Sequence, residues 1–99
     1  MKPFAWDPEA LAEVEAAAAY LEGKHEGLGQ DFRHEMEAAL QDIQRRPALF
    51  TAYQLEGMRR CILQRFKYTI FFAELDDYVW IAAVAHHSQK PGYWHGRTP

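Results

Sequence analysis

The sequence contains few of the residues that build common chemical sites. Its one cysteine, Cys61, excludes an intramolecular disulfide and offers no pair of thiolates for a metal ion. Serine is scarce, Ser88 has no acidic residue close by in the sequence, and no glycine-rich phosphate loop is present. Adjacent carboxylates occur only at Asp76 and Asp77, a pair that fits a turn. No motif therefore indicates an enzyme, and we expect neither a metal ion nor a cofactor.

The sequence also lacks a long apolar run. The longest, residues 78–85, is far shorter than the roughly 20 residues that span a bilayer. Residues 1–10 contain no apolar stretch of signal-peptide length. Together with the single cysteine, these features predict a cytoplasmic protein that makes no use of a membrane.

The length of 99 residues predicts one domain, residues 1–99, because there is little room for a second core. Formal charge is unevenly placed: residues 1–56 hold five Lys/Arg and eleven Asp/Glu, whereas residues 57–99 hold six and three. The first part is therefore near −6 and the second near +3. A modest basic region on an acidic chain favours a protein partner or a local anionic contact over sequence-specific DNA binding.

The first half of the chain predicts a strand and two helices. Residues 2–6 are apolar, and Asp7, Pro8 and Glu9 then supply an N-cap, a first-turn proline and a first-turn acid. Gly23 is the expected end of this helix. Its apolar stripe is predicted at Leu11, Val14, Ala18 and Leu21.

The second helix is predicted to run antiparallel to the first, because the link at residues 23–29 is short. Arg45 and Arg46 fit the negative end of its dipole, and Pro47 ends it. Its stripe comprises Phe32, Met36, Leu40 and Ile43.

After Pro47 the pattern changes to strands. The candidates are residues 51–55 (an edge strand), 58–66, 68–75 and 78–85. We therefore predict an α+β fold in the order β-α-α-β-β-β, in which an N-terminal helical hairpin packs on a small antiparallel sheet. Residues 58–94 mix core residues with unusual polar ones, so we expect the functional site there.

Two adjacent histidines follow the last predicted strand. Neighbouring strand residues point to opposite faces, so His86 and His87 cannot easily chelate one metal ion. Parity places His86 on the face of Trp80 and Val84, and His87 on the other. One of them could act as a general acid or base. The alternative is a structural histidine that hydrogen-bonds the tail.

A basic run and an aromatic tail are the other candidate features. By strand parity, Arg60 lies on one face, whereas Arg59 and Arg65 lie on the other. These cations could bind a partner's carboxylates or phosphates, or form a solvated sheet edge. Tyr93 and Trp94 suit an interface, although Trp94 is also expected to fold back as a plug over the core. Cys61 is expected to be a small buried residue.

Three blocks of the sequence resemble the ParE side of the RelE/ParE toxin superfamily of bacterial type II toxin–antitoxin systems. They are residues 20–32, 65–72 and 83–94. The resemblance covers nearly the whole chain. It implies a helical hairpin on a small antiparallel sheet, a cognate antitoxin whose disordered segment folds onto the chain in a toxin–antitoxin hetero-oligomer, and a role in growth arrest and plasmid stabilisation.

The superfamily implies two activities. RelE-like members cut messenger RNA in the ribosome with basic residues and often a tyrosine, whereas ParE-like members poison DNA gyrase without cutting anything. In this chain Thr69 stands where the RelE pattern has a basic residue after the tyrosine, Tyr68. Gln89, followed by Lys90, stands where an arginine is common. Weaker positive charge would stabilise a cyclising phosphate poorly.

We therefore predict a ParE-like binding toxin with gyrase as its implied target and no catalytic residue. Two alternatives are a RelE-like ribosome-dependent ribonuclease and a non-toxic remnant that only binds antitoxin. The predicted target- or partner-binding residues are Arg60, Arg65, His86, Gln89, Lys90, Tyr93 and Trp94.

Overall fold

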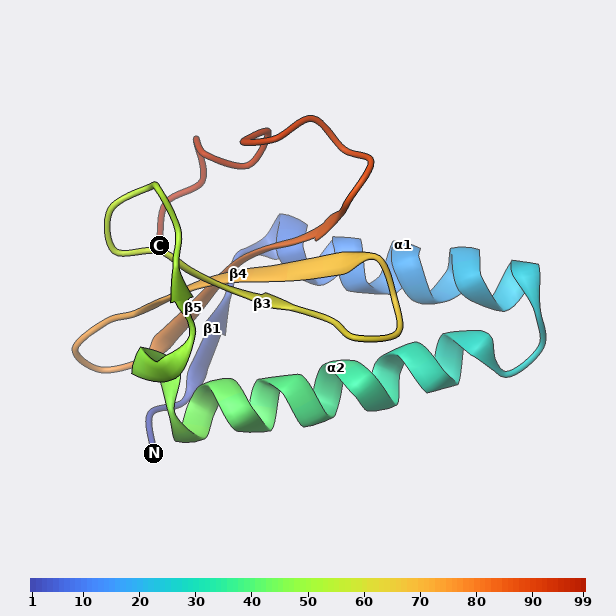
Figure 1. Ribbon diagram of the computed structural model, residues 1–99, viewed down its shortest axis with the longest axis horizontal. Helices are drawn as coiled ribbons and strands as arrows, with labels where there is room; N and C mark the ends of the chain where they lie inside the picture. Colours follow the sequence, from blue (N-terminus) through green and yellow to red (C-terminus); the bar gives the residue numbers. More distant parts are fainter.

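A computed structural model describes residues 1–99 as two helices and a five-stranded sheet (Figure 1). The elements are β1 (Phe4–Trp6), α1 (Pro8–Lys24), α2 (Leu28–Arg45), the 3₁₀ helix η1 (Pro47–Leu49), β2 (Thr51–Ala52), β3 (Arg59–Ile62), β4 (Tyr68–Glu74) and β5 (Val79–His86). The strand order is β1-β5-β4-β3-β2. This arrangement confirms the predicted α+β fold with a helical hairpin on a small sheet.

Two details of the sheet differ from the prediction. The sheet is mixed, because β1 pairs parallel with β5 while every other pair is antiparallel. Four strands follow the helices, one for each candidate stretch, whereas the predicted order β-α-α-β-β-β counted three; the candidate edge strand at residues 51–55 forms only as the two-residue β2. A sheet that ends in so short a strand leaves little exposed edge.

Local sequence signals set the ends of the helices. Asp7 caps α1, and its carboxylate accepts a 2.9 Å hydrogen bond from the backbone N–H of Glu9. The helix continues through Lys24, one residue past the predicted stop. At Gly29, a Cβ atom would lie 2.6 Å from the carbonyl oxygen of Ala18, so the hairpin closes only with glycine there.

The buried face of α1 is rotated from the predicted stripe. Leu11 is 49% exposed, whereas Val14 and Ala18 are buried as predicted and Ala10 and Ala17 complete the buried face. The small alanines allow α1 to approach β5 closely, which the bulkier Leu11 would prevent. In α2 the predicted stripe is confirmed at Phe32, Met36 and Ile43, which are all buried.

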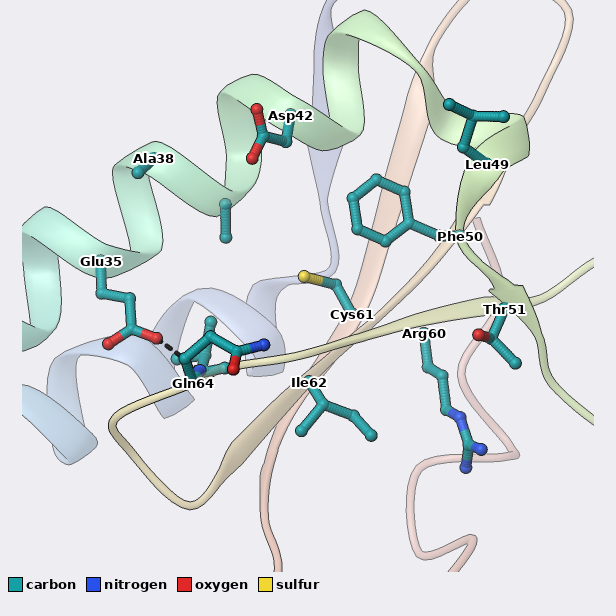
Figure 2. Close-up of a pocket in the computed structure, with 12 residues that line it drawn as sticks. Glu35, Ala38, Asp42, Leu49, Phe50, Thr51, Arg60, Cys61, Ile62 and Gln64 are labelled. Atoms are coloured by element: carbon teal, nitrogen blue, oxygen red, sulfur yellow. Dashed lines mark hydrogen bonds between the residues drawn. The ribbon is translucent and has the colours of Figure 1, made fainter.

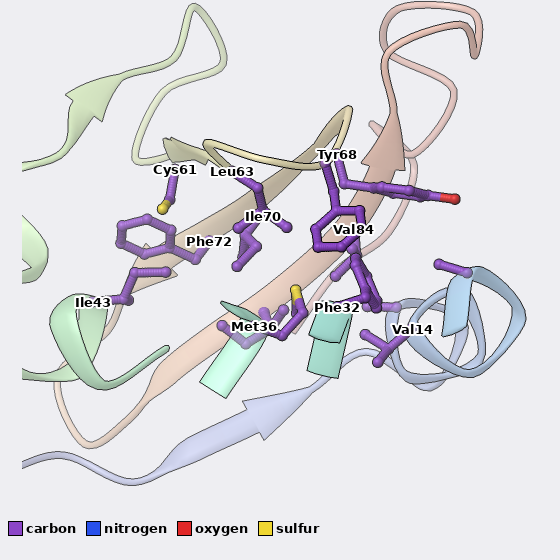
Figure 3. Packing of buried hydrophobic residues seen from close by; sticks show 14 of the residues in the cluster. Val14, Phe32, Met36, Ile43, Cys61, Leu63, Tyr68, Ile70, Phe72 and Val84 are labelled. Carbon is purple, nitrogen blue, oxygen red and sulfur yellow. The ribbon is translucent and has the colours of Figure 1, made fainter. Parts of the chain in front are cut away.

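The main core lies between the helices and one face of the sheet. Figure 3 shows Met36 of α2 facing Ile70 of β4, and Ile43 of α2 beside Phe72 of β4. The Phe32 ring meets that of Tyr68 at 5.2 Å between centroids. We call this side of the sheet the helix-covered face.

The opposite side of the sheet is covered by the irregular tail after β5, and we call it the tail-covered face. In Figure 1 this tail (red) loops back over the sheet toward the loop that follows β2. A second apolar cluster forms there, and its buried members are Met58, Ala73, Trp80, Ala82, Ala83 and Trp94.

A β-bulge in β5 overturns part of the predicted parity: His86, paired with Tyr68, keeps the face of Val84 but not that of Trp80. Phe71 pairs with Ala83 but Phe72 pairs with Ile81, so Ala82 is an extra residue on β5. As a result, Trp80 lies on the tail-covered face whereas Val84 belongs to the core of the helix-covered face. Strict alternation placed both on one face, and that prediction is wrong.

Candidate functional site

Trp94 organises the tail-covered face. Its side chain is only 2% exposed, and its ring lies 4.6 Å from that of Phe71 and 5.6 Å from that of Tyr53. The His95 ring packs edge-on against it at 4.7 Å. The expected plug is therefore confirmed: Trp94 holds the tail on the sheet from beneath and is not itself available to a partner.

A small cavity of about 200 Å³ lies between this tail and the ends of β4 and β5. It brings together five of the seven predicted site residues: His86, Gln89, Lys90, Tyr93 and Trp94. These residues lie close together partly because they are near in the sequence and partly because residues 87–97 fold back over the sheet.

The two histidines make different contacts. The His86 ring packs edge-on against the Tyr68 ring at 5.0 Å, and its Nδ1 lies 2.7 Å from the Ser88 hydroxyl. The His86 backbone N–H donates to the Gln89 side-chain oxygen at 2.7 Å. His87 Nε2 lies 3.0 Å from the Thr69 hydroxyl. Each histidine thus has a structural partner, and no acid–base pair with a carboxylate forms.

The structure also reveals a polar cluster that the sequence analysis missed. Arg97 and Glu13 form a double ion pair, with bonds of 3.0 and 2.9 Å between the guanidinium and the carboxylate oxygens. The Tyr93 hydroxyl donates to the same carboxylate at 2.6 Å. Burial, followed by this bond and the carboxylate charge, raises the pKa of Tyr93. The bond to Glu13 raises the pKa of Arg97.

The two predicted arginines lie on different faces. Arg60 pairs across the sheet with Phe71 and so shares the tail-covered face. Figure 2 shows its side chain pointing away from α2, on the opposite side of β3 from Cys61. Arg65 instead forms an ion pair with Asp31 of α2 at 3.1 Å. The split predicted from strand parity is therefore correct, and Arg65 lies apart from the other site residues.

Two positive charges of the tail-covered face lack an acidic partner. No ion pair in the structure involves Arg60 or Lys90. The chain contains no Asp or Glu after Asp77, while it adds Lys90, Arg97 and three histidines. Since Glu13 and Glu9 pair with Arg97, Arg60 and Lys90 are the unpaired, exposed charges that remain on this face.

Two other hollows lie on the helix side. A groove of about 530 Å³ separates α2 from β3, and Figure 2 shows Cys61 pointing into it while Glu35 accepts a hydrogen bond from the backbone of Gln64. Burial, and then the nearby Asp42 and Glu35, raise the pKa of the Cys61 thiol.

The second hollow, which we call the helix groove, lies between β1, α1 and α2. Its volume is about 370 Å³. The apolar lining comes from Phe4, Trp6, Leu11, Val14, Met36 and Leu40. Charged residues at its rim include the ion pair of Arg33 with Glu15.

No group of three or more His, Cys, Asp or Glu side chains is placed to hold a metal ion. Neither helix has the length and apolar character that a bilayer crossing requires.

Comparisons with known proteins agree with this architecture. A family model described as "ParE toxin of type II toxin-antitoxin system, parDE" matches residues 4–91. A solved structure titled "Chromosomal ParDE TA system from P. aeruginosa" superposes with a TM-score of 0.64 and 12% identity, over 87% of this chain and 96% of that chain. At this identity the likeness concerns the fold. A search of curated proteins finds no match.

Proposed function

The chain belongs to the ParE toxin family of type II toxin–antitoxin systems, and from this premise we propose that it acts by binding a protein target, with DNA gyrase as the target, until an antitoxin neutralises it. The proposal places the chain in the bacterial cytoplasm as one toxin domain. It assigns target binding to the tail-covered face and antitoxin binding to the helix groove.

The observation that carries the proposal is the unpaired positive charge on the tail-covered face. Arg60 and Lys90 are exposed without acidic partners, although the chain as a whole is acidic. Positive charge on one face of an otherwise acidic chain is complementary to an acidic protein surface. Such complementarity speeds the encounter of the two proteins and fixes their relative orientation. Exposed Tyr93 and His95 add amphipathic rings beside these charges.

A binding role also fits the way polar groups are used here. The histidines contact Tyr68, Ser88 and Thr69, and burial, followed by the bond to Glu13, raises the pKa of Tyr93 and keeps it protonated. A general base needs an accessible lone pair near neutral pH, and a tyrosine with a raised pKa does not supply one. We therefore favour binding over ribonuclease chemistry.

The helix groove suits the antitoxin. The groove is apolar, open and flanked by two helices. An amphipathic segment of a partner can lay its apolar face into a groove of this kind. Leu11 is 49% exposed at this groove, so it offers an anchor that the fold itself does not use. A partner segment that ordered there would cover this side chain.

Gyrase supercoiling is the direct test of the proposed target. Relaxed plasmid, gyrase and ATP are incubated with rising amounts of the purified chain, and supercoiled product is measured on gels. We expect inhibition that an equimolar antitoxin, encoded by the adjacent reading frame, reverses. Unchanged supercoiling at excess chain would reject gyrase as the target. New 5′ ends on translated messages, measured by primer extension, would instead indicate the ribonuclease.

The two surfaces can be separated by mutation. We expect Leu11→Glu to weaken antitoxin binding at least about tenfold, since it places a charge in the apolar groove. Gyrase inhibition should remain, because Leu11 lies away from the tail-covered face. The matched control is Ala12→Glu on the same helix, outside the groove lining. Equal loss with both variants would contradict the assignment of the helix groove.

A further inference from the structure

Strand β5 extends beyond its parallel partner. β1 pairs with residues 79–81 of β5, and the Asp7 N–H then donates to the Ile81 carbonyl at 2.9 Å. From Ala82 onward no strand lies on that side of β5. Backbone groups there need other partners, because an unpaired buried N–H or C=O is costly.

Two side chains replace the missing strand. The Glu13 carboxylate accepts from the Val84 N–H at 2.9 Å, and the Arg97 guanidinium donates to the Ala82 carbonyl at 3.0 Å. Because Glu13 and Arg97 also bind each other, they supply an acceptor and a donor as one unit. The side chain of Arg97 is 11% exposed and that of Glu13 is 19% exposed, so water screens this pair little.

The same carboxylate fixes the tail on both sides of Trp94. Tyr93 precedes the plug and donates to Glu13, and Arg97 follows it and pairs with Glu13. These three residues belong to α1 and to the tail, more than 70 positions apart in the sequence. The family match ends at residue 91, so it says nothing of this contact.

We propose that Glu13 is a positioning residue that locks residues 87–97 in the conformation that binds the target. This inference rests on the proposed function. The exposed loop that carries Lys90 has no regular secondary structure, and its shape depends on its anchors. A loop fixed before binding loses less conformational entropy in the complex, and so it binds more tightly.

The test compares Glu13→Ala with Glu15→Ala. Both replace a glutamate of α1 that pairs with an arginine, but the pair of Glu15 with Arg33 is on the exposed surface. Amide hydrogen exchange by NMR should show the Val84 and tail amides exchanging at least about tenfold faster in Glu13→Ala only. Ile70, in the fully buried part of β4, should exchange at an unchanged rate. Unchanged exchange of the tail would overturn the lock.

The functional arm uses gyrase inhibition and growth arrest on induction. We expect Glu13→Ala to need at least about tenfold more chain for the same effect, with antitoxin binding unchanged. Arg97→Lys, which keeps the charge but loses the paired donors, should give a smaller loss and serves as the second variant if Glu13→Ala folds poorly. Full activity in spite of a loosened tail would overturn the positioning role.

The two arms separate this inference from the proposed function. If the wild-type chain arrests growth without inhibiting gyrase, the gyrase proposal fails and the lock is judged by growth arrest. If the wild-type chain does neither, both proposals are overturned.

Discussion

The helix-covered face of the sheet buries a cluster of 16 residues, whereas the tail-covered face buries six. Two helices close the first face mostly with apolar side chains. An irregular tail closes the second with one large ring, Trp94, and a carboxylate–guanidinium pair. The first face has the features of a folding core. The second depends on a few directional contacts, which suits a surface that must hold a defined shape in water.

The largest expected effect lies on the helix-covered face. Phe32 is fully buried and packs against Phe66 and Tyr68, so Phe32→Ala leaves a cavity between α2 and β4. We expect a loss of about 3–5 kcal/mol in the free energy of unfolding, measured by urea denaturation. A loss under about 1 kcal/mol would show that this face isn't the main core.

Removing the plug should have a more local effect. Trp94→Ala deletes a buried ring, but the tail can shift into the space, so we expect about 3 kcal/mol, the low end for such changes. Hydrogen exchange should rise in residues 87–97 while amides of α2 keep their protection. If α2 loses protection equally, the two faces unfold as one unit and the contrast between them fails.

Tyr93 makes the stability of the tail-covered face depend on pH. Its pKa is raised in the folded state, so the stability it contributes is present below its ordinary pKa of about 10 and is lost as the pH rises above that value. Tyr93→Phe should therefore reduce the fall in stability between about pH 9 and pH 11. Urea midpoints at each pH measure this, with Tyr20→Phe, an exposed tyrosine, as the control. Identical slopes in Tyr93→Phe and the wild type would contradict the bond to Glu13.

The smallest expected effect is on the reactivity of the Cys61 thiol, which can be measured in the wild-type chain. Burial and nearby carboxylates raise its thiol pKa, so little thiolate is present at pH 8. We expect reaction with a disulfide reagent at least about tenfold slower than for a free cysteine peptide. Urea should abolish the difference. Rapid labelling of the folded chain would indicate that the groove between α2 and β3 opens readily.

Much of the helix-covered face could be predicted from the sequence, because it depends on local signals. The Asp7-Pro8-Glu9 start of α1, the stripe of α2 and the helix end before Pro47 are all present in the structure. Leu11 was misplaced because periodicity alone does not register that alanines let a helix approach a strand more closely. The parallel pairing of β1 with β5 depends on contacts between distant segments.

The tail-covered face was harder to predict. Strand parity failed at the bulge of Ala82, since one extra residue reverses every later side chain. The Glu13–Arg97 pair spans 84 positions and ends in a segment without periodicity. Glu13 stood off the apolar stripe of α1, which is the only signal that it had a different role.

The central claim is that the tail-covered face binds the target. The most direct measurement is gyrase supercoiling with Lys90→Glu, beside Arg45→Glu, which reverses an exposed charge at the end of α2. We predict that Lys90→Glu raises the half-inhibitory concentration at least about tenfold, because it opposes complementary charge, and that Arg45→Glu changes it less than about twofold. Equal inhibition by Lys90→Glu and the wild type would contradict the claim.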